Sequence, residues 1–137
     1  MHRLPDDRPD RDTTLESDEL IVGIDVRASG VTRRSHYLKV RERASYEFAL
    51  VSVAAGVELE GETVRDVRIA LGGVAHKPWR LAEAEAALRG RPFTRAGVRD
   101  AVRGAFGAAR PLRDNAFKIT LAQRAIVRAL GTLGARA

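Results

Sequence analysis

The sequence predicts a single α+β domain in which three helices pack on one face of an antiparallel sheet of three to four strands. Runs with the two-residue alternation of β-strands occupy the first half of the chain, and helix-forming runs occupy the second half. Strands followed by helices, rather than alternating with them, are typical of an antiparallel sheet covered on one side. The length of 137 residues fits one such domain with one hydrophobic core.

The chain begins with a polar segment. Residues 1–18 are charged and contain proline, so we interpret them as an irregular connector, with the domain itself over residues 19–137. The first predicted strand covers residues 19–27. One face of this strand would carry Leu20, Val22, Ile24 and Val26, which alternate as in a half-buried strand.

Three further strands are predicted before the helices begin. Residues 35–41 alternate again, and residues 46–60 form a long aliphatic and β-branched run. Residues 63–71 follow after a compact turn centred on Gly61, which predicts an antiparallel hairpin. The apolar positions of the last strand slip in phase near Asp66, which indicates a β-bulge.

Three helices are predicted in the second half of the chain. Residues 81–89 contain strong helix formers and end before Gly90. Thr94 is a suitable N-cap for a helix over residues 95–109, and a third helix is predicted over residues 114–130. The apolar stripe of this third helix, which we expect in the core, consists of Phe117, Leu121, Ala125, Ile126, Ala129 and Leu130.

The composition excludes several classes of protein. Without cysteine, this chain supplies no disulfide, thiolate metal site or iron–sulfur ligand. No apolar stretch approaches the roughly 20 residues that span a bilayer, and the first residues lack a secretory signal. Residues 1–20 carry seven acidic and three basic side chains, whereas the rest of the chain is strongly basic. The basic body either indicates a polyanionic partner or reflects a preference for arginine in the coding sequence.

Motifs for catalysis are lacking. His2, His36 and His76 do not have the spacing of metal ligands, and no serine lies in a nucleophile elbow. No phosphate-binding glycine pattern occurs, and we interpret Gly72-Gly73 as the end of a strand. The sequence therefore does not predict an enzyme that is active alone.

Three longer strings carry a resemblance to a known family. They are YLKVRERASYEFALVSVAAGVEL at 37–59, ALGGVAHKPWRLAEAEAALRGRPF at 70–93 and DNAFKITLAQRAIVRAL at 114–130. In this order they resemble the C-terminal domain of the FAD-binding (medium) subunit of molybdenum hydroxylases, the xanthine dehydrogenase, aldehyde oxidoreductase and CO dehydrogenase flavoprotein family. The lead-in HRLPDDRPDRDTTLESDELI also resembles the connector that follows the FAD-binding domain in that family.

The resemblance implies an oxidoreductase subunit in which FAD transfers electrons. In the family a separate N-terminal domain with glycine-rich loops holds most of the FAD, while this domain encloses the flavin and docks partner subunits. The implied partners are that FAD-binding domain, a large subunit with the molybdenum cofactor and a small subunit with iron–sulfur clusters. Neither nucleic acid nor a membrane is expected as a partner. The implied compartment is the cytoplasm, or the periplasm if the complex is exported with a partner.

The resemblance also implies where the flavin would lie. Residues 39–46 resemble the basic, aromatic-ended stretch that borders the flavin, which makes Lys39, Arg41, Arg43 and Tyr46 candidate flavin contacts. Cations at this place would stabilise an anionic reduced flavin. The simpler interpretation is that the three basic residues share an exposed strand face. Related subunits often have an acidic residue where this chain has Ser45, which argues against a flavin-tuning carboxylate at that position.

Two other functions remain open at the level of sequence. The chain could be a free-standing interaction or dimerisation domain that does not touch flavin. Its basic body could also bind nucleic acid, although no aromatic residues interleave with a basic stripe as base stacking would require.

Overall fold

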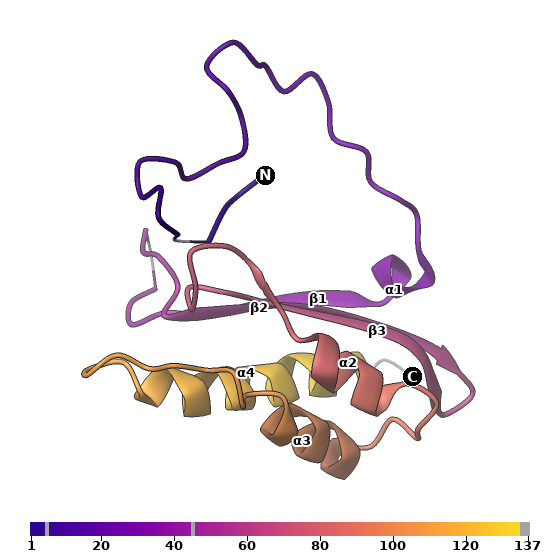
Figure 1. Cartoon of the computed structure of the whole chain (residues 1–137). Helices are drawn as coiled ribbons and strands as arrows, with labels where there is room; N and C mark the ends of the chain where they lie inside the picture. Colours follow the sequence, from indigo (N-terminus) through magenta and orange to yellow (C-terminus); the bar gives the residue numbers. More distant parts are fainter. Residues whose placement is uncertain (5, 45, 135–137) are drawn as a thin grey trace.

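The sheet and helices form two layers, as the sequence predicts. The computed structural model describes residues 1–4, 6–44 and 46–134. A four-stranded antiparallel sheet runs in the order β1-β2-β3-β4, with β1 at Ser35–Val40, β2 at Val51–Glu60, β3 at Thr63–Gly72 and β4 at Trp79–Arg80. Figure 1 shows three helices on one face of this sheet: α2 (Ala82–Leu88), α3 (Arg95–Gly104) and α4 (Phe117–Gly134). A single helical turn, α1 (Gly30–Arg33), precedes β1.

The β2–β3 hairpin is the central element. Gly61 has a φ of 60°, a left-handed conformation that glycine adopts without strain, and it closes the turn. The register shifts between Glu58, which pairs with Asp66, and Leu59, which pairs with Val64. The extra residue on β3 confirms the bulge that the sequence predicts near Asp66.

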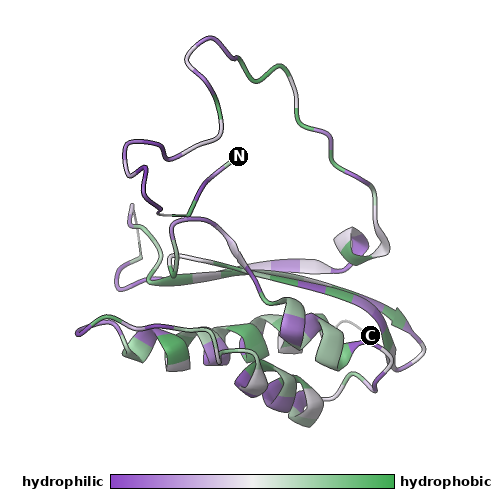
Figure 2. Ribbon diagram, in the orientation of Figure 1, coloured by the Kyte–Doolittle hydropathy of each residue, from purple (hydrophilic) through white to green (hydrophobic). Residues whose placement is uncertain are grey.

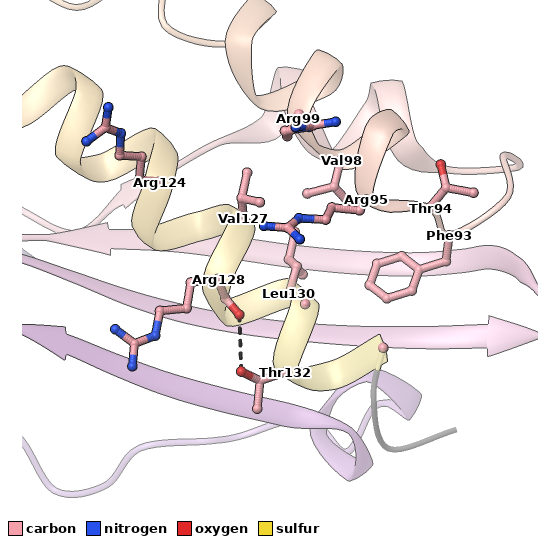
Figure 3. Close-up of a pocket in the computed structure, with 12 residues that line it drawn as sticks. Phe93, Thr94, Arg95, Val98, Arg99, Arg124, Val127, Arg128, Leu130 and Thr132 are labelled. Carbon is pink, nitrogen blue, oxygen red and sulfur yellow. Dashed lines mark hydrogen bonds between the residues drawn. The ribbon is translucent and has the colours of Figure 1, made fainter.

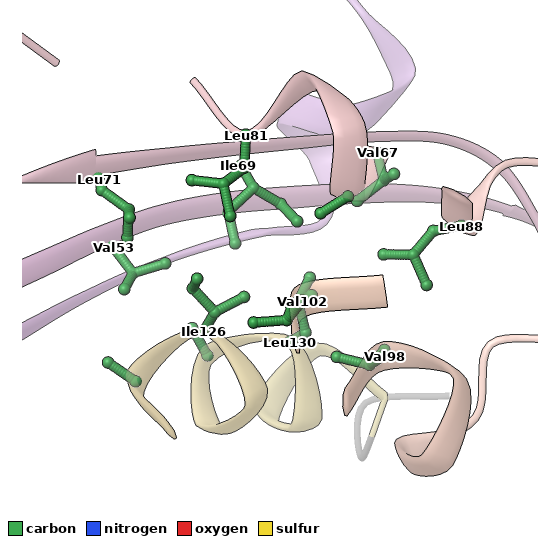
Figure 4. Packing of buried hydrophobic residues seen from close by; sticks show 14 of the residues in the cluster. Val53, Val67, Ile69, Leu71, Leu81, Leu88, Val98, Val102, Ile126 and Leu130 are labelled. Carbon is green, nitrogen blue, oxygen red and sulfur yellow. The ribbon is translucent and has the colours of Figure 1, made fainter. Parts of the chain in front are cut away.

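The core lies between the sheet and the helices. Side chains from alternate positions of β2 and β3 meet the apolar stripes of the three helices, as Figure 4 shows. Burial of aliphatic side chains on this scale is the main force that holds the two layers together. The largest fully buried apolar residues are Ile69, Leu71, Leu88, Ile126, Leu130 and Leu133.

The ends of the helices explain their lengths. The hydroxyl of Thr94 accepts a hydrogen bond from the backbone N–H of Gly97 at 3.1 Å, which confirms the predicted N-cap of α3. That helix ends at Gly104 instead of residue 109, because glycine lowers helical stability. At the other end of the fold the guanidinium of Arg34 donates two hydrogen bonds to the carbonyl of Leu133 and satisfies the last turn of α4.

Glu85 links α2 to the sheet. Its carboxylate is 1% exposed and accepts hydrogen bonds from the backbone N–H of Ile69 at 2.9 Å and from both sides of the Arg80 guanidinium at 2.8 and 2.5 Å. Burial alone would raise the pKa of Glu85. The hydrogen bonds and the positive charges of Arg80 and Arg68 outweigh burial, so the pKa lies below its usual value.

Three sequence predictions are wrong in detail. Residues 19–27 form no strand and lie outside the sheet, and the fourth strand is instead the two-residue β4. The strand predicted from residue 46 begins at Val51, because residues 46–50 leave the sheet as part of a loop. Phe117 is 54% exposed at the start of α4, where the helix extends beyond the core. None of the helices among residues 1–4, 6–44 and 46–134 has the length and apolarity to cross a membrane.

Candidate functional site

The four predicted flavin contacts lie at one end of the sheet. Lys39 is an exposed residue of β1, and Arg41, Arg43 and Tyr46 are exposed on the loop of residues 41–50 that joins β1 to β2. Because β1 ends at Val40, the three basic residues do not share a strand face, which was the simpler interpretation of the sequence. Two of them lie instead on a projecting loop, where a ligand can reach them.

The base of this loop is held by the sheet and α4. The backbone N–H of Leu50 donates to the carbonyl of Val40 at 2.9 Å. Gly73, with a φ of 74°, passes so close to the loop that a Cβ atom there would lie 2.8 Å from the carbonyl oxygen of Ala49. The ammonium of Lys118 in turn donates to the carbonyl of Gly73 at 2.9 Å. Gly72-Gly73 therefore both ends β3 and lets the loop pack closely.

The tip of the loop is organised by a carboxylate that sequence reasoning missed. Glu47 accepts hydrogen bonds from the backbone N–H groups of Glu42 at 3.1 Å and Arg43 at 2.9 Å. Tyr46 has a φ of 38°, which is rare for a residue other than glycine, and its side chain is 99% exposed. The side chain of Phe48 is 96% exposed. Ser45 lies outside the described residues.

The loop presents positive charge and aromatic surface together. Within the described ranges, no carboxylate forms an ion pair with Lys39, Arg41 or Arg43. Cations and exposed aromatic residues on the same loop and the adjoining end of β1 suit a planar ligand that carries negative charge. No group of three or more histidine, aspartate or glutamate side chains that could hold a metal ion occurs in the part of the chain that the structure describes.

The sheet face away from the helices adjoins this loop. Lys39 pairs in register with Ser52, which pairs with Gly72, and Tyr37 pairs with Ala54 and through it with Ala70. Ser52, Ala54, Ala70 and Gly72 are small, so this part of the sheet face carries little side-chain bulk. A hollow of about 370 Å³ lies on it, with Tyr37, Arg68 and Arg80 among the residues that line it. Another domain can therefore approach this face closely.

A groove of about 1030 Å³ lies between α3 and α4 on the helical side. Its apolar lining includes Phe93, Val98, Val127 and Leu130, and its basic lining consists of Arg95, Arg99, Arg124 and Arg128. In Figure 3 the side chain of Arg95 extends from α3 towards α4, beside Val127. None of the four arginines is ion-paired with another described residue.

Comparison with known proteins identifies the domain. Residues 36–133 match the family of CO dehydrogenase flavoprotein C-terminal domains. The chain belongs to this family. The match confirms the resemblance that the sequence carries at residues 37–59, 70–93 and 114–130, and it accounts for the sheet covered by helices.

Two relatives of this chain come from a bacterium and an archaeon. The whole chain is 40% identical to the FAD-binding subunit PaoB of the Escherichia coli K12 aldehyde oxidoreductase and covers 40% of that subunit. The glyceraldehyde dehydrogenase medium chain of Sulfolobus acidocaldarius is 39% identical to this chain over 64 residues. These residues are 47% of this chain and 22% of that protein.

Solved structures share the fold. Carbon monoxide dehydrogenase from Hydrogenophaga pseudoflava, in a form that lacks the Mo-pyranopterin moiety of its cofactor, superposes with a TM-score of 0.68 at 31% identity, over 83% of this chain and 40% of the other. Quinoline 2-oxidoreductase from Pseudomonas putida 86 superposes with a TM-score of 0.69 at 23% identity, over 76% of this chain and 38% of the other. The chain thus spans well under half the length of the proteins it matches.

Proposed function

We propose that this domain closes over the flavin of a molybdenum hydroxylase and contributes Lys39, Arg41, Arg43 and Tyr46 to the flavin's surroundings. The observation that carries the proposal is the loop of residues 41–50, which is held at its base and, with Lys39 beside it on β1, carries exposed aromatic side chains and basic side chains that form no ion pair with the described residues. Membership of the flavoprotein family supplies the identity of the planar ligand that such a loop suits.

Each side chain has a distinct part in the proposal. Lys39, Arg41 and Arg43 would stabilise negative charge on the flavin, because cations lower the free energy of a nearby anion most where water is excluded. Tyr46 and Phe48 would cover the edge of the ring system and limit the access of water. Bound FAD would accept and pass on electrons, which is chemistry that none of these side chains supplies.

The rest of the complex follows from the family. We propose that most contacts to FAD come from an FAD-binding domain, as the name of the E. coli relative suggests. The molybdenum cofactor and the iron–sulfur clusters would reside in partner subunits. Hydroxylation of an aldehyde or a nitrogen heterocycle would take place there, and this domain would serve only the electron transfer.

The groove between α3 and α4 supports a second role in assembly. Four arginines that pair with no carboxylate of the described residues surround an apolar floor, which suits a protein segment that carries both acidic and apolar side chains. We propose that such a segment of a partner subunit docks there. This role would hold whether or not the domain also touches flavin.

A chimeric subunit tests the flavin contacts. Residues 1–137 would replace the matching 40% of E. coli PaoB, and the chimera would be produced with the other subunits of that oxidoreductase. We expect the triple replacement of Lys39, Arg41 and Arg43 by Ala to lower the midpoint potential of the flavin by about 30 mV or more, equivalent to a tenfold loss in the stability of its reduced form. Replacement of three exposed basic residues elsewhere, Arg33, Lys77 and Arg103, is the matched control.

The results separate the two roles. An unchanged potential in the triple variant, with FAD still bound, would contradict the proposed flavin contacts. Replacement of Arg95, Arg99 and Arg124 by Glu should instead weaken assembly of the complex by tenfold or more and leave the potential unaltered. Full assembly of that variant, measured by mass photometry, would contradict docking at the groove.

A further inference from the structure

The lead-in contains an apolar segment that the domain does not use. Residues 20–26 form neither helix nor strand, and Leu20, Val22, Ile24 and Val26 are 83%, 95%, 84% and 82% exposed. Figure 2 shows the apolar colour along the limb of the lead-in that descends to α1. Scattered exposed apolar residues are common, but so many within one short segment mark a surface that another protein covers.

This segment has no strand partner among the residues of its own chain that the structure describes. Residues 20–28 make no backbone hydrogen bond within the described ranges, and the limb of the lead-in that descends to α1 stands away from the sheet in Figure 1. Among the described strands, the edge strand β1 pairs only with β2. Buried backbone groups need hydrogen-bond partners, so covering these side chains must also satisfy the backbone N–H and C=O groups beside them.

The residue pattern specifies the kind of partner. Four aliphatic side chains at two-residue spacing, three of them β-branched, are typical of a strand with one buried face. Such a segment is completed by the free edge of a sheet, which supplies both the hydrogen bonds and the apolar cover. The alternation that predicts a strand at residues 19–27 is therefore meaningful, although none of the described strands lies beside it.

Its place in the family indicates which sheet. The match to the C-terminal domain family begins at residue 36, so residues 20–26 lie outside that domain. The E. coli FAD-binding subunit nevertheless aligns with all 137 residues of this chain. The aligned region makes up only 40% of that subunit. We propose, on the basis of the proposed function, that residues 20–26 form a β-strand on the sheet of the FAD-binding part of the subunit.

The proposal also fixes where that part would lie. Only three residues separate Val26 from Gly30 at the start of α1, which limits the gap to about 14 Å between their Cα atoms. The turn of α1 packs on the sheet face away from α4, since a Cβ at Gly56 would lie 2.6 Å from the carbonyl oxygen of Val31. The added strand would thus hold the FAD-binding part beside the helix-free face on which Lys39 lies.

Hydrogen exchange measured residue by residue tests the proposal in the isolated chain and in the PaoB chimera. In the isolated chain, amides 20–26 should exchange as in an unstructured peptide. In the chimera we expect alternate amides of the segment to exchange at least 100-fold more slowly. Replacing Val22 and Ile24 together by Asn should abolish this protection, whereas the matched change of Ile21 and Asp25 to Asn, on the other face, should retain it.

The outcomes distinguish this proposal from the proposed function. A chimera that binds FAD and assembles, but exchanges all these amides rapidly, would overturn the added strand and leave the flavin role intact. Protection in an assembled chimera without FAD would support the strand and contradict the flavin role. Protection that appears in the isolated chain together with a dimeric mass would assign the strand to a second copy and overturn the proposal.

Discussion

At the scale of single residues, Glu85 determines how α2 meets the sheet. The sequence places it on the apolar face of the predicted helix, four residues after Leu81 and three before Leu88. That position is the signal that could have marked it as buried. Its partners Ile69 and Arg80 lie on β3 and β4, and the sequence does not predict β4 because that strand has only two residues.

Replacing Glu85 by Gln should lower the free energy of unfolding at pH 7 by about 2 kcal/mol. The amide keeps the shape of the side chain but loses the charge-assisted hydrogen bonds with Arg80. Urea unfolding followed by circular dichroism measures the change. Glu83→Gln on the exposed face of α2 is the control and should change the value by less than about 0.5 kcal/mol.

The same carboxyl predicts how stability depends on pH. Because the pKa of Glu85 is lower in the folded chain than in the unfolded chain, its contribution is complete above the usual value of 4.5 and is lost as the pH falls through the folded pKa. The pKa of Asp66 is also lowered, since its interactions with Arg89, Val67 and Arg68 outweigh the effect of burial. Unfolding curves between pH 7 and pH 2 should show acid destabilisation that is shallower in Glu85→Gln. Equal slopes in both proteins would contradict the assignment.

Gly73 should tolerate no side chain. Alanine there would adopt a left-handed backbone and crowd the carbonyl oxygen of Ala49, so we expect a loss of about 1–3 kcal/mol in the free energy of unfolding. Gly104→Ala is the control, because a Cβ at that position meets nothing within 4 Å. Similar stability of the two variants would show that the loop is not held at Gly73.

At the scale of elements, periodicity predicts which face of a strand or helix is buried, but not which other element covers that face. The hairpin, the bulge near Asp66 and the cap at Thr94 depend on local residues, and the sequence contains all of the information that they require. The strand predicted at residues 19–27 would need a partner strand, which no local pattern reveals, and these residues form no strand in the structure. Residues 46–50 of the loop are predicted as strand because their apolar side chains join the long aliphatic run of β2.

Removal of residues 1–28 should leave the domain folded. All described hydrogen bonds and ion pairs of this segment stay within it, and the buried core begins at Val31. We expect the free energy of unfolding to change by less than about 1 kcal/mol. Thermal unfolding of the shortened chain should show a cooperative transition at a midpoint similar to that of the whole chain. Loss of that transition would show that the lead-in is part of the fold.

At the scale of the whole molecule, the chain has one domain's core and surfaces that suit other partners. The basic loop, the helix-free sheet face and the groove between α3 and α4 lie on different sides of the same two layers. The resemblance in the sequence identifies the family, and the structure adds how Gly73, Glu47 and Lys118 position the candidate residues. The roles of Gly73 and Lys118 come from contacts between segments far apart in the chain, which a single sequence does not show, whereas Glu47 acts within its own loop.

The flavin content of the purified PaoB chimera tests the central claim most directly. Absorbance at 450 nm after denaturation would give the number of FAD molecules per subunit. We expect close to one FAD, with the flavin fluorescence poorly quenched by iodide because the domain covers the ring. A chimera that folds and assembles but retains no FAD, or holds FAD that iodide quenches like free flavin, would contradict the claim that this domain encloses a flavin.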